Sequence, residues 1–266
     1  MREIGHFFNQ ELWRFSFGIY LLIYLLVDFP YAALLYSSDG LVEMNPSFWN
    51  HPYFIFFLQG LASLAALSFA CGYRRRTAAL ILFLVAARKF SLNPACESPE
   101  LAFVNWILLA QFLIQDAHAP SRAVRDSSLI VLASAYCYSA VSKWFFGDLS
   151  WRTGMASWYA LADSSSHIDW YISILNRMPV WMFSTATFFV LFIEFVGPLA
   201  ILHRMTTKLW WSATTLLHLI FLITMNSAQL SLGMLFFHWF VYVNASRTSW
   251  SVQPFILGFF RRSQRQ

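Results

Sequence analysis

Charged side chains are scarce in this sequence. Asp, Glu, Lys and Arg make up 12% of its 266 residues, whereas hydrophobic types make up 58%. A soluble globular domain carries about 25% charged residues, because its surface must face water. The mean hydropathy of +0.53 points the same way. The composition therefore excludes an ordinary soluble domain and predicts a polytopic membrane protein.

Cysteine is rare as well. The three cysteines, Cys71, Cys96 and Cys137, lie in three different segments, which predicts neither a disulfide framework nor a metal motif. The histidines lack the i, i+3 or i, i+4 spacing of a zinc site, so we expect no metal. The net charge of +5 is small, and no basic patch with interleaved aromatics stands out. This pattern indicates loops that touch anionic lipid and disfavours nucleic acid as a partner.

Long apolar runs take the place of the missing charge. They predict an all-α transmembrane helical bundle of seven or eight spans, with eight preferred. The third run is the weakest, because Arg88 and Lys89 interrupt it. Residues 148–180 are too polar to span, and their mixture of Trp, Tyr and charge is typical of interfacial helices. The runs cover residues 15–36, 53–72, 78–93, 101–115, 128–147, 181–202, 209–225 and 229–243.

The distribution of Lys and Arg predicts the side of the membrane that each loop faces. With eight spans and a cytoplasmic N-terminus, thirteen basic residues fall inside and four outside, while Lys143 lies within the fifth span. This bias follows the positive-inside rule, so we expect both termini in the cytoplasm and Lys143 near the outer leaflet. The outside residues are Arg88, Lys89, Arg152 and Arg177. The inside residues are Arg2, Arg14, Arg74, Arg75, Arg76, Arg122, Arg125, Arg204, Lys208, Arg247, Arg261, Arg262 and Arg265.

Ionisable side chains inside the predicted spans are the first candidates for function. A charged group costs about 2.5–3.5 kcal/mol at the centre of a bilayer, so it usually faces protein or a water-filled cavity. The spans contain Asp28, Lys143, Glu194, His218 and His238.

Lys143 lies on a helix face that is otherwise small. On helical spacing, Tyr136, Ala140, Lys143 and Gly147 are neighbours, and only Tyr136 is bulky. Another helix or a ligand can approach such a face closely. We expect this face to line an internal space, with Glu194 or His218 opposite.

Each of these ionisable residues also has an alternative, purely structural interpretation. Lys143 lies about one turn from the predicted outer boundary, where its amine can reach the interface as an anchor. Glu194 can serve as a partner for Lys143 or for an arginine. Asp28, near Pro30, can cap or kink the first span, and a single histidine such as His218 often only satisfies helix packing.

Three stretches carry a resemblance to a known family. The stretch "YSAVSKW" (Tyr138–Trp144), followed by Trp151 and Gly154, is similar to the "AG-x-x-K…W-x-x-G" stretch of the vitamin K-dependent γ-carboxylase family, whose membrane domain is the HTTM domain that bacteria also use alone. "MNSAQLSLGM" (Met225–Met234) resembles a later segment of that domain, and "QFLIQDAH" (Gln111–His118) is a weaker match. The pieces keep one order over about residues 10–245. We therefore treat residues 1–266 as a single domain of this kind, in a bacterial inner membrane.

The resemblance implies a specific chemistry. The carboxylase lysine that matches Lys143 deprotonates reduced vitamin K. Oxygenation then gives a strong base that removes a proton from substrate carbon, and the quinone leaves as an epoxide. A partly desolvated lysine suits this task, because desolvation favours its neutral form. Lys143, Glu194 and His218 are thus the catalytic candidates, and the candidates for binding a menaquinone-type reduced quinone are Tyr136, Trp151, Met225 and Asn226.

The departures from the family pattern bear on the substrate. Glu100 and Leu101 stand near the place of one carboxylase histidine, and Ile223 and Thr224 near the place of a second. Three extra residues separate Lys143 from Trp151, and the large extracytoplasmic domain that grips the carboxylase's peptide is missing. We therefore expect no carboxylation of a clotting-type protein. A lipid, another peptide or a small molecule is the expected substrate.

A second class of function stays open. The chain also resembles an HTTM protein needed to make a secreted bacterial toxin, which favours a non-catalytic membrane component for maturation or export of a peptide. A third option, a quinone-reducing partner of a thiol oxidoreductase, is disfavoured because the sequence has no Cys-x-x-Cys. The oligomeric state stays open too.

Overall fold

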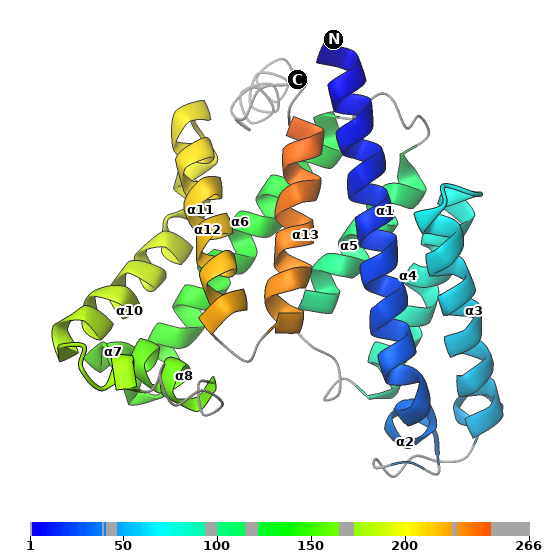
Figure 1. The fold of residues 1–266 in the computed structure, drawn as a ribbon, viewed down its shortest axis with the longest axis horizontal. Helices are drawn as coiled ribbons and strands as arrows, with labels where there is room; N and C mark the ends of the chain where they lie inside the picture. Colours follow the sequence, from blue (N-terminus) through cyan, green and yellow to red (C-terminus); the bar gives the residue numbers. More distant parts are fainter. Residues whose placement is uncertain are drawn as a thin grey trace, which may run out of the picture. The chain divides into compact units, whose positions relative to one another are not determined.

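The computed structural model of this protein is all-helical in the part that it describes, namely residues 2–38, 40, 47–93, 100–114, 122–164, 173–224 and 228–245. No β-strand occurs among these residues, so the all-α prediction is confirmed. Each of the eight apolar runs falls largely on helix (Figure 1). The chain divides into two compact units, Met1–Pro120 and Ser121–Gln266.

The first unit is built around helix α3, which contacts α1, α2 and α4. Helix α1 packs along α3, and α3 and α5 both pack on α4 (Figure 1). The elements, in chain order, are α1 (Arg2–Asp28), η1 (Phe29–Tyr31), α2 (Ala32–Tyr36), η2 (Phe48–Asn50), α3 (Pro52–Ala70), α4 (Arg75–Leu92) and α5 (Glu100–Leu113).

A glycine lets α1 and α3 approach closely. A Cβ atom on Gly18 would come 2.7 Å from Ala70, which is shorter than any ordinary carbon contact. The side chain of Gln59 on α3 donates a hydrogen bond to the carbonyl oxygen of Leu25 on α1 at 2.7 Å. Small residues and one buried amide therefore join the two helices, as is common between apolar helices.

Lys89 and Asp28 form an ion pair that the sequence did not predict. Helix α4 continues unbroken through Arg88 and Lys89, and the Lys89 side chain is only 7% exposed. Its Nζ lies 3.0 Å from Asp28 Oδ2 and 4.6 Å from the centre of the Tyr36 ring. Lys89 therefore lies in a helix and not in an outside loop, which corrects the prediction. Of the two roles expected for Asp28, capping is wrong, because its side chain makes no capping hydrogen bond at the start of η1.

The second unit carries the remaining long helices. Its central helix α6 contacts α10, α11 and α13, and α12 packs on α13. The elements, in chain order, are α6 (Arg122–Phe145), α7 (Leu149–Thr153), α8 (Ala156–Ser164), α10 (Val180–Phe195), α11 (Gly197–Ala200), α12 (Arg204–Thr224) and α13 (Ala228–Ala245).

The short helices α7 and α8 lie in the segment predicted to be interfacial, and one threonine holds them on α10. Thr187 Oγ1 donates to the carbonyl oxygen of Gly154 at 2.9 Å and accepts from the backbone N–H of Ser157 at 3.0 Å. Gly154 ends α7 with φ +79°, a conformation that glycine adopts without strain. The turn after α7 is therefore fixed on the side of α10.

Among the residues that the structure describes, two helical segments are long and apolar enough to cross a membrane by length and composition, namely Asn9–Tyr36 and Pro52–Ala70. Leu101–Leu113 and Val180–Phe195 are apolar but shorter. Helix α4 differs because it contains Arg75, Arg76, Arg88 and Lys89, and α6 differs because it begins with charged residues.

Candidate functional site

Helix α6 brings Lys143 to its C-terminal turn. The helix ends where the backbone N–H groups of Phe146 and Gly147 both donate to the carbonyl oxygen of Ser142, at 2.8 and 2.9 Å. This arrangement satisfies a carbonyl group that would otherwise lack a partner. A cation in the last turn is also favoured by the helix dipole, so the position stabilises the Lys143 ammonium.

Glu194 faces Lys143 from α10. The Lys143 Nζ lies 2.6 and 2.8 Å from the two carboxylate oxygens of Glu194. The Glu194 side chain is 5% exposed and that of Lys143 is 26% exposed. Pro198 follows Glu194 by four residues and offers no N–H to its carbonyl, so α10 ends at Phe195 with the carboxylate close to the break.

Trp151 covers the ammonium from α7. Its ring centre lies 4.8 Å from Lys143 Nζ, within the range of a cation–π interaction. A Cβ atom on Gly147 would lie 2.9 Å from the Trp151 ring, so the absence of a side chain there makes room for the indole. The structure thus brings the predicted residues Lys143, Glu194 and Trp151 into one site.

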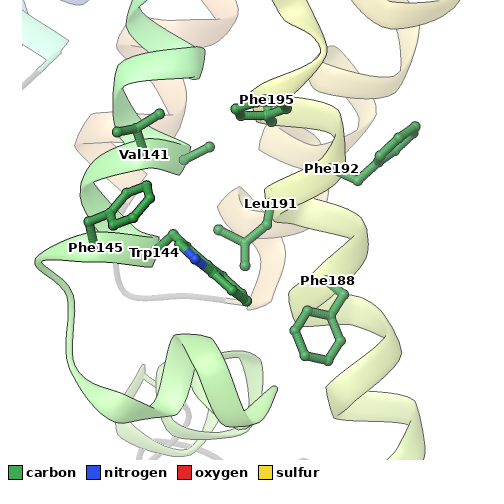
Figure 2. Close-up of a pocket in the computed structure, with 8 residues that line it drawn as sticks. Val141, Trp144, Phe145, Phe188, Leu191, Phe192 and Phe195 are labelled. Carbon is green, nitrogen blue, oxygen red and sulfur yellow. The ribbon is translucent and has the colours of Figure 1, made fainter.

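An apolar groove of about 430 Å³ lies between α6 and α10 beside this ion pair. Figure 2 shows the Trp144 indole reaching from α6 toward Phe188 and Leu191 on α10. Ala140 is one turn before Lys143 and Leu191 is three residues before Glu194, so these two lining residues lie next to the pair. The lining residues are Ala140, Val141, Trp144, Phe145, Phe188, Leu191, Phe192 and Phe195.

A second polar cluster lies deeper in the same unit. The hydroxyl oxygen of Tyr136 is 2.6 Å from Nε2 of His218 on α12 and 3.0 Å from Nε2 of His238 on α13. All three side chains are buried. Tyr136 and Lys143 share one face of α6, two turns apart, so the cluster and the ion pair lie on the same side of the helix.

The structure places most of the predicted site residues but not all of them together. Tyr136 and His218 contact each other, while Lys143 contacts Glu194 and Trp151. None of these five residues lines the groove. Met225 and Asn226 lie outside the described residues.

His238 completes the buried cluster although it carried no predicted role. Its signal was a polar residue in an apolar run, ten residues after the start of α13 at Ala228, while His218 lies six residues before the end of α12 at Thr224. Helices joined by a short connection are antiparallel neighbours, so two such residues can meet. The contact with Tyr136 depends on a third helix, which spacing alone does not place.

The side chains of this site decide whether it could bind a metal ion or a small molecule. In the described part of the chain, no three His, Cys, Asp or Glu side chains converge in a way that could hold a metal ion. The groove suits a hydrocarbon ligand, because its lining is apolar and its volume lies within the usual range for a small-molecule pocket. The ion pair is the polar group adjacent to the groove.

Comparisons with models of protein families, with curated proteins and with solved structures find no match to this chain. The site is therefore defined by its own geometry, as an ion pair next to an apolar groove.

Proposed function

We propose that this protein is an eight-span integral membrane enzyme of the HTTM kind, which uses a reduced quinone and oxygen to act on a lipid, peptide or small-molecule substrate. One observation carries the proposal. The Lys143–Glu194 pair, a group able to accept a proton, lies beside a groove that only an apolar molecule suits.

The surface of the helices supports placement in a membrane. On α10, Val180, Trp181, Phe189 and Phe192 are each more than half exposed. An exposed apolar face of this extent is unfavourable in water and suits contact with acyl chains. The eight spans would be α1 with its extension to Tyr36, α3, α4, α5, α6, α10 with α11, α12 and α13. Helices α7 and α8 would lie at the outer interface.

The groove would bind the apolar part of the ligand, and the ion pair would bind its hydroxyl group. Phe188, Phe192 and Trp144 offer surface for a ring or an isoprenoid tail that enters from the bilayer. Lys143 and Glu194 offer a charge-assisted hydrogen bond to a hydroxyl group. A bound reduced quinone supplies an ionisable hydroxyl and two electrons. The residues of this chain supply orientation and a place for the proton.

The pair takes up a proton as a unit. In the resting ion pair both oxygens of the Glu194 carboxylate accept hydrogen bonds from the Lys143 ammonium. The ammonium proton moves from Nζ to the carboxylate across 2.6 Å, which leaves a neutral amine to accept the next proton. This route ends in an ammonium beside a neutral acid. Lys143 is thus a base whose readiness depends on Glu194.

Arginine at position 143 tests this role. Lys143→Arg should keep the ion pair and the fold but lower quinol turnover by about 100-fold or more, because a guanidinium does not give up its proton. Lys143→Ala should also lose activity, although it leaves a buried carboxylate unpaired. Turnover is followed as quinol consumed and quinone or epoxide formed in nanodiscs. Wild-type turnover in Lys143→Arg would show that the lysine is only an anchor.

Filling the groove tests ligand binding directly. We expect menaquinone to be extracted in about equimolar amount from the purified protein and to be lost from Ala140→Phe, whose ring would occupy the groove beside the pair. Leu209→Phe is the matched control, because Leu209 is 68% exposed on α12 and does not line the groove. Mass spectrometry of extracted lipids gives the readout. Equal quinone content in both variants, or none in the wild type, would contradict the proposal.

One observation favours the alternative, a non-catalytic membrane component for maturation or export of a secreted peptide. Both oxygens of Glu194 already accept hydrogen bonds from Lys143, as in a purely structural ion pair. A stoichiometric protein partner that copurifies without quinone, with full host function in Lys143→Arg, would support this second function.

A further inference from the structure

The Tyr136 hydroxyl lies between two imidazole rings, and this position limits which ring nitrogens can carry a proton. The distances of 2.6 and 3.0 Å to Nε2 of His218 and His238 are both hydrogen-bond distances. The exposed fractions are 5% for Tyr136, 5% for His218 and 0% for His238. Buried groups at these distances must be matched as donor and acceptor, because unmatched polar groups are costly.

One hydroxyl proton cannot serve both rings. If Tyr136 donates to one Nε2, the other Nε2 must carry a hydrogen and donate to the tyrosine oxygen. The neutral histidines are then opposite tautomers, one protonated at Nε2 and the other at Nδ1. The Thr214 hydroxyl also lies near this oxygen, but it donates its own proton to the Trp210 carbonyl at 3.0 Å.

The outer nitrogens of the two rings are the ends of this hydrogen-bonded arrangement. Nδ1 of His218 and Nδ1 of His238 are buried and have no hydrogen-bond partner within the described part of the chain. One is an acceptor and the other a donor in the tautomer pair above. A linear array results, which runs from Nδ1 of one ring through the tyrosine oxygen to Nδ1 of the other.

We propose that His218, Tyr136 and His238 form a buried proton relay that carries a proton between α12 and α13. A proton binds Nδ1 of His218, whose Nε2 proton passes to the Tyr136 oxygen. The hydroxyl proton of Tyr136 passes to Nε2 of His238, and His238 releases its Nδ1 proton. One proton enters, one leaves, and the two tautomers exchange with no bond to carbon broken and no side chain moved.

The surrounding side chains keep the array in place. The Trp210 ring packs edge-on against Tyr136 at 5.6 Å, and Trp211 Nε1 donates to the carbonyl oxygen of His238 at 3.1 Å. The Trp210 indole is itself fixed by a hydrogen bond to the Ile193 carbonyl at 2.9 Å. Ile193 is next to Glu194 in the sequence. The hydrogen bond from Trp210 to Ile193 therefore connects the packing around Tyr136 to the backbone that carries Glu194.

The link to turnover rests on the proposed function. A proton accepted by the Lys143–Glu194 pair must leave before the next cycle, and Tyr136 shares the face of α6 that carries Lys143. Tyr136 lies about 10 Å from Lys143 along α6, at 1.5 Å per residue. The relay is therefore placed to clear the proton from the pair.

Nitrogen-15 NMR of histidine-labelled protein in nanodiscs tests the relay without any quinone. We expect one Nε2–H and one Nδ1–H ring among the buried histidines, in exchange with each other, assigned with His218→Gln and His238→Gln. Tyr136→Phe should abolish the exchange and leave the other signals in place. Tyr138→Phe is the control, since Tyr138 is 76% exposed on the same helix. Two rings of the same tautomer, or exchange that persists in Tyr136→Phe, would overturn the proposal.

Turnover separates this proposal from the proposed function. The sequence made Tyr136 a candidate for quinone binding, but Tyr136 does not line the groove. Tyr136→Phe should therefore bind as much menaquinone as the wild type but oxidise quinol about 100-fold more slowly. Unchanged turnover in Tyr136→Phe would overturn the relay and leave the quinol enzyme standing. Opposite, exchanging tautomers in a protein that binds no quinone would support the relay and contradict the quinol enzyme.

Discussion

At the scale of residues, the Lys143–Glu194 ion pair matters because, among the described residues, neither side chain forms a second ion pair. Removal of Lys143 leaves the Glu194 carboxylate buried and unpaired, which costs about 3–5 kcal/mol in comparable cases. Removal of Glu194 leaves the partly exposed Lys143 ammonium without its carboxylate partner. Replacement of both by apolar residues of similar size avoids that penalty. The pair therefore behaves as one unit in stability as well as in proton transfer.

A double-mutant cycle tests the coupling between the two residues. Lys143→Met and Glu194→Gln should each lower the thermal unfolding midpoint in detergent. The double variant should unfold at a higher temperature than either single variant, because no unpaired charge remains. Losses that simply add would contradict a direct ion pair. Lys143→Arg should stay close to the wild type, since it can still bond both carboxylate oxygens.

At the scale of elements, α7 shows how a local signal fixes a short helix. The Asp148 side chain accepts hydrogen bonds from the Ser150 hydroxyl and, at 2.8 Å, from the Ser150 backbone N–H, as an N-cap residue does. These hydrogen bonds hold the pKa of Asp148 below its usual value. The cap therefore contributes in full above the pKa of an unfolded aspartate, about 3.9, and is lost as pH falls through the lower folded value.

Hydrogen exchange at the start of α7 measures this cap. After correction for intrinsic rates, protection of the Ser150 amide should be pH-independent near neutrality and fall in acid. Asp148→Ala should show low protection at every pH, whereas Asp148→Asn should keep it in acid, because an amide oxygen accepts the bond without titrating. Equal protection in Asp148→Ala and wild type would show that the cap does not hold α7.

The helices were predictable from the sequence, but most of their contacts were not. Apolar length alone located helix α6, and helical spacing placed Tyr136 and Lys143 on one face of it. Lys89 was misread as a loop residue because a charge in an apolar run looks like an interruption. Its ion pair with Asp28 joins residues 61 positions apart, and no local pattern encodes such a contact. His238 was passed over for the same reason.

At the scale of the whole molecule, the charge distribution predicts topology. Burial removes Lys89 from the outside group, which leaves Arg88, Arg152 and Arg177. Arg125 is buried too, in an ion pair with Asp126, so twelve of the inside residues remain. The bias toward the cytoplasm is thus stronger than the sequence count indicates. A cysteine placed after Gln266 should be labelled by an impermeant maleimide only after cell lysis. A C-terminus labelled from outside in intact cells would reverse the predicted orientation.

The ion pair between Asp28 and Lys89 also constrains how the chain is made. Asp28 leaves the ribosome 61 residues before its partner, which is about 3–12 seconds at roughly 5–20 residues per second. In the proposed membrane protein, the first helix would lack the ammonium partner of its carboxylate during that interval. We therefore expect it to stay at the insertion machinery or to take a shallow position until α4 arrives. A nascent chain stopped before Lys89 should remain extractable by carbonate, whereas one stopped after α4 should resist extraction. Lys89→Met should keep the longer chain extractable.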